Sequence, residues 1–153
     1  MPELSSEMDI LLKENIVLNA QASDKLEAIR LSGNVLVQAG YVEPAYVDGM
    51  LGREETMSTY IGNGVAIPHG ELDDRELIHS TGLSVIQFRD GIEWEDDELA
   101  FLVIGIAATA DEHMVVLSNL AEVLEDPDSA EELATTDDPM VILERLTRPS
   151  EDD

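Results

Sequence analysis

Residues 101–107 read FLVIGIA, an uninterrupted apolar run with the length of one β-strand. A strand with one face in water alternates apolar and polar residues, but this run has no polar side chain on either face. A continuous apolar strand is typical of a sheet whose two faces are both covered. We therefore expect residues 101–107 to be the central strand of an α/β fold.

Three further segments have the composition of strands. They are residues 16–19 (IVLN), 65–67 (VAI) and 83–88 (LSVIQF). The last of these is bounded by Gly82 and by RDG at 89–91, a combination typical of a turn. We expect these segments to join the central strand in one sheet.

Two helices are expected before residues 65–67. The apolar residues of the first fall on one side of a helix: Leu26, Ile29, Leu36 and Val37. Ser23 or Asp24 caps its N-terminus, and Gly40 ends it. Pro44 suits the first turn of the second helix, and residues 47–54 continue at helical spacing.

Three helices are expected after the central strand. The first starts at or just before His113, and its apolar residues form one stripe: Leu117, Leu120, Ala121 and Leu124. Asp128 and Glu131 have the spacing of a capping box, with Asp128 as the cap of the second helix. Asp138 followed by Pro139 opens the third, because proline at the first helical turn loses no hydrogen bond.

These elements predict the fold class. Strands mixed with helices indicate an α/β protein, and several connections are too short for a βαβ crossover. We expect a three-layer sandwich in which a mixed, mostly parallel sheet is flanked by helices. The 153 residues contain no internal repeat and no dividing linker, so we expect a single domain over residues 1–153. Its ordered core spans about 4–146, and residues 147–153 form a frayed tail.

The charge of the chain limits its partners. Asp and Glu number 34 against 8 Lys and Arg, so the formal net charge is −26 at pH 7. Nucleic acids and anionic membrane surfaces repel such a chain, since affinity for phosphate backbones depends on Lys and Arg. We expect no nucleic-acid partner, and we expect protein partners that present basic surfaces.

The sequence also bears on compartment and redox chemistry. No apolar run approaches the roughly 20 residues that span a bilayer, so we expect no direct membrane insertion. The start MPELSSEMDI lacks the basic and apolar regions of a secretory signal, which predicts a cytoplasmic protein. Cysteine is absent, which excludes disulfides, thiolate nucleophiles and cysteine-ligated metal sites.

Residues 62–71 read GNGVAIPHGE and place a histidine where strand material ends. Pro68 holds the residue before it in extended conformation, and Gly70 lets other backbone come close to His69. His113 lies in the first turn of the helix that follows the central strand. A lone histidine at a strand end is more often structural than functional, but two at sheet ends favour a joint site.

Common nucleotide and hydrolase motifs are absent. The chain has no GxxxxGK[ST], no GxGxxG after a strand and no GxSxG, so nucleotide binding and serine hydrolysis have no support. A zinc site remains open if His69, His113 and either Asp111 or Glu112 converge. His79 lies in a polar connection, and we expect it to be an exposed loop residue.

Three blocks of the sequence carry a family resemblance. Residues 40–71, 79–92 and 102–126 resemble, in collinear order, the enzyme IIA component of the bacterial phosphoenolpyruvate-dependent sugar phosphotransferase system, in its mannitol branch. The similarity covers roughly residues 4–146. It implies a phosphocarrier without metal or other cofactor: the protein HPr donates a phosphoryl group to a histidine, which passes it to a cysteine of enzyme IIB, and the membrane enzyme IIC couples this to sugar entry.

The resemblance implies roles for particular residues. In the family the histidine of the PHG motif, here His69, is phosphorylated on Nε2, and the second histidine, here His113, supports the phosphohistidine. Arg53 corresponds to an arginine that stabilises charge. Backbone N–H groups near residues 110–113, at a helix N-terminus, are candidate ligands of the phosphoryl group. The family usually has threonine after PHG, whereas this chain has Glu71, which places a negative charge near the phosphoryl group.

The partner surface is expected around His69. Apolar neighbours, including Ile61, Val65 and Ile67, inside an acidic rim would suit a face of HPr that presents basic residues. Long-range attraction between opposite charges then speeds association, while the complexes stay weak enough to dissociate in each cycle.

Alternatives remain open at this stage. Domains similar to enzyme IIA also serve as regulatory modules whose phosphorylation state is read by other proteins, without sugar transport. A metal-binding protein is the third choice. The choice between mannitol, fructose and other polyols resides in enzyme IIC, which contacts the sugar.

The excess of acidic residues has two explanations. The chain comes either from a salt-tolerant host or from an ordinary bacterium with an acidic proteome. For a salt-adapted chain we expect the melting temperature to rise with KCl, since the screening length falls from about 30 Å at 0.01 M to about 3 Å at 1 M. Thermal melts in a KCl series measure this. A melting temperature indifferent to salt would exclude the salt-tolerant host.

Overall fold

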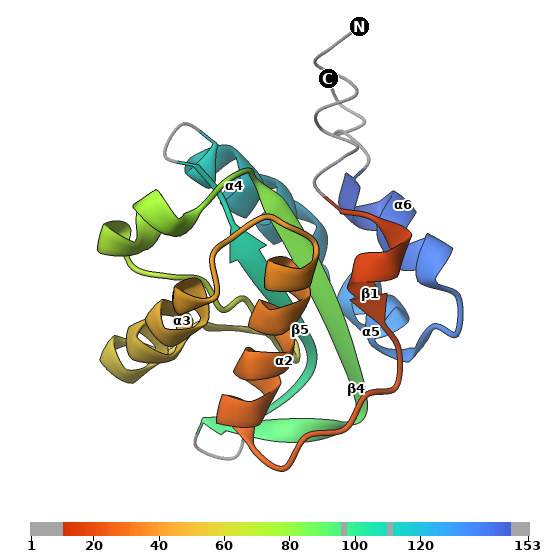
Figure 1. Ribbon diagram of the computed structural model, residues 1–153. Coiled ribbons are helices and arrows are strands. Elements are labelled where there is room, and N and C mark those ends of the chain that lie inside the picture. The colour runs from red at the N-terminus through yellow and green to blue at the C-terminus, as the bar shows by residue number, and fades with distance from the viewer. Residues whose placement is uncertain (1–10, 96–97, 110–111, 148–153) are drawn as a thin grey trace, which may run out of the picture.

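The sheet is the centre of the molecule. A computed structural model describes residues 11–95, 98–109 and 112–147. Five strands form one sheet in the order β1-β4-β5-β3-β2. Their bounds are Ile16–Val17 for β1, Tyr60–Gly62 for β2, Val65–Ala66 for β3, Gly82–Glu95 for β4 and Glu98–Ala107 for β5. The apolar run at 101–107 lies in the middle strand, which confirms the prediction made from it (Figure 1).

The sheet is mixed, as expected. Parallel pairings join β1 to β4 and β3 to β5, and antiparallel pairings join β4 to β5 and β2 to β3. Parallel pairing therefore accounts for two of the four. Because β3 and β5 run in the same direction, their carboxyl ends meet at one edge of the sheet, which is where both histidines of interest follow.

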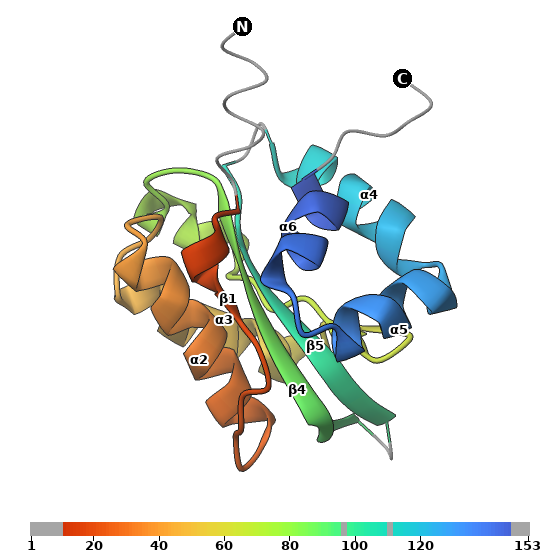
Figure 2. The same ribbon diagram turned by 90° about the vertical axis from the view of Figure 1, so that its right-hand side faces the viewer.

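Helices cover both faces of the sheet. On one face lie α2 (Lys25–Gln38) and α3 (Ala45–Thr56), and on the other lie α4 (His113–Leu124), α5 (Pro127–Thr135) and α6 (Pro139–Thr147), as Figure 2 shows. Two short 3₁₀ segments, η1 (Lys13–Asn15) and η2 (Leu72–Leu77), complete the described part of the chain. The expected three-layer α/β sandwich is confirmed. None of the helices in the described ranges is long and apolar enough to cross a membrane.

Strand β5 supplies both hydrophobic cores. Leu102, Ile104 and Ile106 point into the core shared with α4, α5 and α6. Val103 and Ala107 point into the core shared with α2 and α3. Successive side chains of a strand face opposite sides, so a strand buried on both sides must be apolar at every position. This requirement explains the uninterrupted run.

Strand β4 differs from the prediction at its second half. The sequence Arg89–Gly91 was expected to be a turn, but β4 continues through it to Glu95. The pairing register with β5 shifts between Gln87 and Ile92, so the three residues form an irregularity within the strand. Gly91 has φ +81° there, a conformation that glycine adopts without strain. The prediction of a turn at residues 89–91 is wrong, although glycine there does mark a local irregularity, a β-bulge within the strand.

The helix ends agree with the sequence except at α5. Asp24 caps α2 by accepting a hydrogen bond from the N–H of Glu27, and Asp138 accepts from the N–H of Met140 at the start of α6. The prediction of Asp128 as the cap of α5 is wrong. Asp126 is the cap, because Pro127 occupies the first helical position.

Two other expectations concern burial and the chain end. Ile29 and Leu36 are buried in the stripe predicted for α2, but Leu26 is 40% exposed. Of the tail predicted at 147–153, Thr147 is the last residue of α6, and residues 148–153 lie outside the described part of the chain. Strand β2 was not predicted, since three residues are too few to show a period.

Shortening single side chains of β5 should distinguish its buried positions from its exposed ones. Ile104→Ala removes a fully buried side chain and should lower the free energy of unfolding by about 2–5 kcal/mol, through lost burial and a residual cavity. Leu99→Ala, on the same strand but 42% exposed, should cost less than about 1 kcal/mol. Urea denaturation measures both. Equal losses would contradict a strand buried on both faces at its centre.

Candidate active site

His69 and His113 meet at the edge where β3 and β5 end. The chain after β3 continues beside β5: the N–H of Ile106 donates to the carbonyl of Pro68 at 2.9 Å, and His69 bridges to Ile106 in parallel register. His113 opens α4 shortly after β5 ends. The two imidazole centroids are 5.7 Å apart, with the rings inclined at 66°. The structure thus brings together the two histidines that the sequence singled out.

The backbone fixes the tautomer of His69. Its Nδ1 lies 2.8 Å from the carbonyl oxygen of Ile67. A carbonyl can only accept a hydrogen bond, so Nδ1 must carry the proton. In a neutral imidazole the other nitrogen, Nε2, then keeps its lone pair. His69 is therefore arranged to act as a nucleophile through Nε2.

Burial lowers the pKa of His69 below its ordinary value, because the charged ring loses hydration. The positive charge of Arg53 and the electrostatic effect of the neighbouring His113 lower the pKa further, while the Ile67 carbonyl and the carboxylate of Glu54 oppose this by favouring the charged ring. The net direction is downward, so the ring is neutral at pH 7. A neutral ring is what nucleophilic attack requires.

Tyr46 holds the residue after His69. Its buried hydroxyl donates to the carbonyl of Ile106 at 2.9 Å and accepts from the N–H of Gly70 at 2.9 Å. Burial raises the pKa of Tyr46 to about 12, so the hydroxyl keeps its proton. A Cβ at residue 70 would lie 2.6 Å from the tyrosine ring, which explains the glycine after His69. Tyr46 was not predicted from the sequence. The available signal was a tyrosine on the inner face of a helix, which needs a partner for its hydroxyl.

Arg53 lies in the last turn of α3 and is half-buried. Its Nη1 donates to the carbonyl of Met57 at 2.6 Å, which anchors the guanidinium. Its charge lowers the pKa of His69, so it acts on that ring. Among the described residues this is the only hydrogen bond of the Arg53 side chain, and a guanidinium has five N–H donors. The group can therefore bind an anion while anchored.

The N-terminus of α4 only partly matches the predicted anion site. Residues 110 and 111 lie outside the described part of the chain. The N–H of Glu112 donates to the carbonyl of Thr109 at 3.0 Å, so this N–H is engaged. The carboxylate of Glu112 contacts the hydroxyls of Thr81 and Thr109. Bonding within α4 begins with the N–H of Val116, which donates to the carbonyl of Glu112, so the N–H of His113 has no partner inside the helix. The side chain of His113 is half-buried and lies beside His69.

The predicted apolar ring around His69 needs correction. Val65 is buried in the core, so it cannot line a docking surface as predicted. Ile67 is partly buried and packs against the same core. Ile61 is exposed. Other exposed apolar side chains adjoin the site residues in the chain: Met57 is 64% exposed, Met114 72% and Val115 58%.

The zinc alternative gains no support from the described residues. No group of three His, Asp or Glu side chains there is placed to hold a metal ion. Asp111, one of the suggested ligands, lies outside the described part of the chain. Glu112 is within it, and its carboxylate contacts threonine hydroxyls.

The two other residues singled out in this region are both exposed. His79, expected in an exposed loop, forms a surface contact with Glu43, with Nε2 and Oε2 2.7 Å apart. Glu71 is exposed, and its carboxylate lies over Gly52 of α3, where Oε2 is 3.2 Å from the position of a Cβ. Glu71 is thus beside the residue that precedes Arg53.

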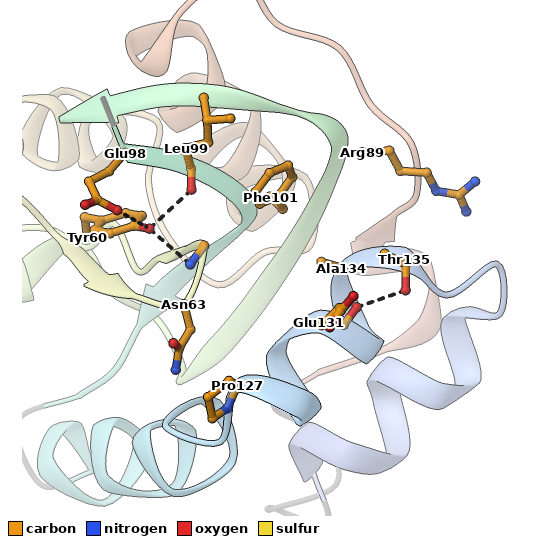
Figure 3. Close-up of a pocket in the computed structure, with 11 residues that line it drawn as sticks. Tyr60, Asn63, Arg89, Glu98, Leu99, Phe101, Pro127, Glu131, Ala134 and Thr135 are labelled. Atoms are coloured by element: carbon orange, nitrogen blue, oxygen red, sulfur yellow. Dashed lines mark hydrogen bonds between the residues drawn. The ribbon is translucent and has the colours of Figure 1, made fainter. Parts of the chain in front are cut away.

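A separate cavity of about 620 Å³ lies elsewhere on the molecule (Figure 3). Phe101 and Leu99 from the first half of β5 line it, together with Tyr60 and residues of α5 such as Glu131. The Tyr60 hydroxyl is held by Glu98, the Leu99 carbonyl and the Gly64 N–H. His69 bridges to the opposite end of β5, so this cavity is distinct from the histidine pair.

The mixed sheet, the three layers and the paired histidines agree with the class of protein that the sequence resembles, a phosphotransferase domain of the enzyme IIA kind. The family model for "Phosphoenolpyruvate-dependent sugar phosphotransferase system, EIIA 2" matches residues 9–148. The chain belongs to this family.

Individual relatives agree with this assignment. The chain is 52% identical over 128 residues to a multiphosphoryl transfer protein of Haemophilus influenzae. The aligned region covers 84% of this chain but only 26% of that protein's length. It is 44% identical over 142 residues to the mannitol-specific phosphotransferase enzyme IIA component of Geobacillus stearothermophilus, covering 91% of this chain and 98% of that one. The fold matches enzyme IIA of mannitol in its complex with phosphorylated enzyme IIB from Escherichia coli, with a TM-score of 0.82, 41% identity, and 87% and 94% of the two chains covered.

Removal of the arginine charge should move the titration of His69. Because the positive charge of Arg53 lowers the pKa of His69, Arg53→Gln should raise that pKa toward its ordinary value of about 6.5. Titration of the ring by NMR measures it. In the wild type the neutral ring should persist as pH falls through 6.5 and become charged only below it. Any stability that depends on the neutral ring is then complete above pH 6.5 and declines below it.

A matched control is Arg89→Gln. Arg89 carries the same charge, but its guanidinium contacts the Thr136 carbonyl and Asp137 next to α5. This variant should leave the titration of His69 unchanged. An equal shift in both variants would mean that general surface charge, and not Arg53 in the site, sets the pKa.

Proposed function

We propose that the chain is a phosphocarrier that accepts a phosphoryl group from phospho-HPr on Nε2 of His69 and passes it to the cysteine of a mannitol-type enzyme IIB. The observation that carries the proposal is the hydrogen bond between Nδ1 of His69 and the carbonyl of Ile67, at 2.8 Å. It leaves one nucleophilic nitrogen, of defined position, at the edge of the sheet. The work takes place in the cytoplasm, where phosphoenolpyruvate is made.

The two transfers use the same lone pair. In the first, Nε2 of His69 forms a bond to phosphorus while the N–P bond of the donor histidine breaks and the donor nitrogen recovers its electron pair. In the second, a thiolate forms an S–P bond and Nε2 recovers its pair. His69 keeps its Nδ1 proton throughout. The phosphorylated ring is formally cationic, so the Ile67 carbonyl, which accepts from Nδ1, stabilises it.

Local positive charge offsets the anionic exterior. A net charge of −26 opposes the approach of a dianionic phosphoryl group. Arg53 presents a planar fork suited to phosphoryl oxygens, and His113 offers a ring N–H. Phosphoryl transfer depends mainly on such positioning and charge stabilisation.

The partners follow from the relatives and the surface. The mannitol assignment is supported by 44% identity across nearly the whole Geobacillus mannitol component, and the enzyme IIB partner by the Escherichia coli complex. The exposed side chains of Met57, Met114 and Val115, next to Arg53 and His113, offer apolar contact to a partner. The acidic surface then attracts a partner with a basic face.

Substitutions of the three polar residues should have different effects. His69→Ala should accept no phosphoryl group, because the nucleophile is gone. His113→Ala and Arg53→Ala should still be phosphorylated, but about 10²-fold more slowly, since each removes one preorganised donor. Incubation with labelled phosphoenolpyruvate, enzyme I and HPr, followed by measurement of acid-labile label, gives the rates. His79→Ala, at an exposed histidine, is the control and should behave as the wild type.

Transfer from the labelled chain to a mannitol enzyme IIB fragment tests the second half of the proposal. Label that appears on the cysteine of enzyme IIB identifies a transport component. A chain that accepts label but never transfers it to enzyme IIB would instead favour the regulatory alternative. Label retained on His69→Ala would contradict the assignment of the acceptor.

A further inference from the structure

The carboxylate of Glu54 is buried beneath the site. The residue is only 5% exposed, and its oxygens accept four kinds of donor. Thr59 donates its hydroxyl at 2.6 Å and its N–H at 3.2 Å, Trp94 donates Nε1 at 3.0 Å, and Lys25 places Nζ at 3.4 Å. A buried carboxylate is costly unless its acceptors are satisfied, and here they are. Such a group is rigidly held, and it holds its donors in return.

A chain of hydrogen bonds leads from this carboxylate to His69. Glu54 accepts from the N–H and hydroxyl of Thr59. The carbonyl of Thr59 accepts from the N–H of Ile67 at 3.0 Å, and the carbonyl of Ile67 accepts from Nδ1 of His69 at 2.8 Å. Each residue along this path is therefore fixed on both sides.

We propose that Glu54 is a positioning residue for phosphoryl transfer, acting through Thr59 and Ile67 to hold His69 in the tautomer that leaves Nε2 unprotonated. This inference rests on the proposed function of His69. Glu54 does not touch the phosphoryl group. It fixes the position of the carbonyl that selects the tautomer.

The same carboxylate also orders the arginine. Arg53 precedes Glu54 at the end of α3, and its guanidinium is anchored on the carbonyl of Met57. Residues 57–59 connect α3 to β2, and the N–H and hydroxyl of Thr59 close this connection by donating to the carboxylate of Glu54. One buried group thus sets the position of both the nucleophile and its charge partner. Misplacement of reacting groups by about 1 Å can cost 10²-fold in rate.

The test is Glu54→Gln with Trp94→Phe as its matched control. Glu54→Gln removes the negative charge and leaves one acceptor oxygen, so Thr59 and Trp94, which now donate to different oxygens, compete for it. Trp94→Phe removes a different donor to the same carboxylate but leaves the bonds to Thr59. Both variants disturb the buried cluster, so both should lower stability in urea denaturation. Only Glu54→Gln removes the charge and an acceptor from the group to which Thr59 donates.

Two measurements distinguish positioning from stability. ¹⁵N chemical shifts of the His69 ring report which nitrogen carries the proton, and steady-state kinetics with phospho-HPr give kcat and KM. In Glu54→Gln we expect a mixture of tautomers and a kcat lowered about tenfold, with KM changed less than about twofold, because geometry and not partner binding is affected. In Trp94→Phe we expect the wild-type tautomer and kcat.

Several outcomes would overturn the proposal. An unchanged tautomer in Glu54→Gln, or equal losses of kcat in both variants, would reduce Glu54 to a structural role. If Glu54→Gln does not fold, Thr59→Val removes only the 2.6 Å hydroxyl bond and should shift the tautomer in the same direction. No shift in that variant counts against the proposal. If wild-type His69 is never phosphorylated, the proposed function fails, whereas the ¹⁵N measurement still decides whether Glu54 controls the tautomer.

Discussion

The contact on which the site depends is the hydrogen bond from Nδ1 of His69 to the carbonyl of Ile67. It decides which nitrogen is protonated, and through this decision it gives the ring one reactive atom. The neighbouring backbone is held by other bonds: Pro68 by Ile106 of β5, and Gly70 by the Tyr46 hydroxyl. Because adjacent residues on both sides are tied to regular structure, the imidazole is oriented before any partner arrives.

The electrostatics of the site differ from those of the chain as a whole. The exterior is strongly anionic, yet burial and the charges of Arg53 and His113 all act against a proton on His69. The same two residues are those that we propose to receive a phosphoryl group. Under the proposed function one arrangement thus serves both the free and the phosphorylated state, since positive charge that repels a proton attracts a phosphoryl group.

Sequence reasoning identified what depends on local pattern. The apolar run at 101–107 predicted the central strand because a strand buried on both sides must be apolar throughout, and the common edge of β3 and β5 then placed His69 beside His113. Tyr46 and Glu54 escaped prediction, because their partners Ile106 and Trp94 lie far away in the chain. The extent of β4 escaped for a related reason: Gly91 signals a bend, and only pairing with β5 turns the bend into a bulge.

Under the proposed function, a single nucleophilic nitrogen at one edge of the sheet has a further consequence for the order in which partner proteins bind. The phosphoryl donor and the phosphoryl acceptor must both approach Nε2 from this edge, and each occupies the space that the other needs. The proposed function therefore implies a ping-pong cycle in which donor and recipient alternate and no ternary assembly forms. Rapid dissociation of each partner protein then becomes as important to turnover as phosphoryl transfer itself, and modest affinity for both partners is an advantage.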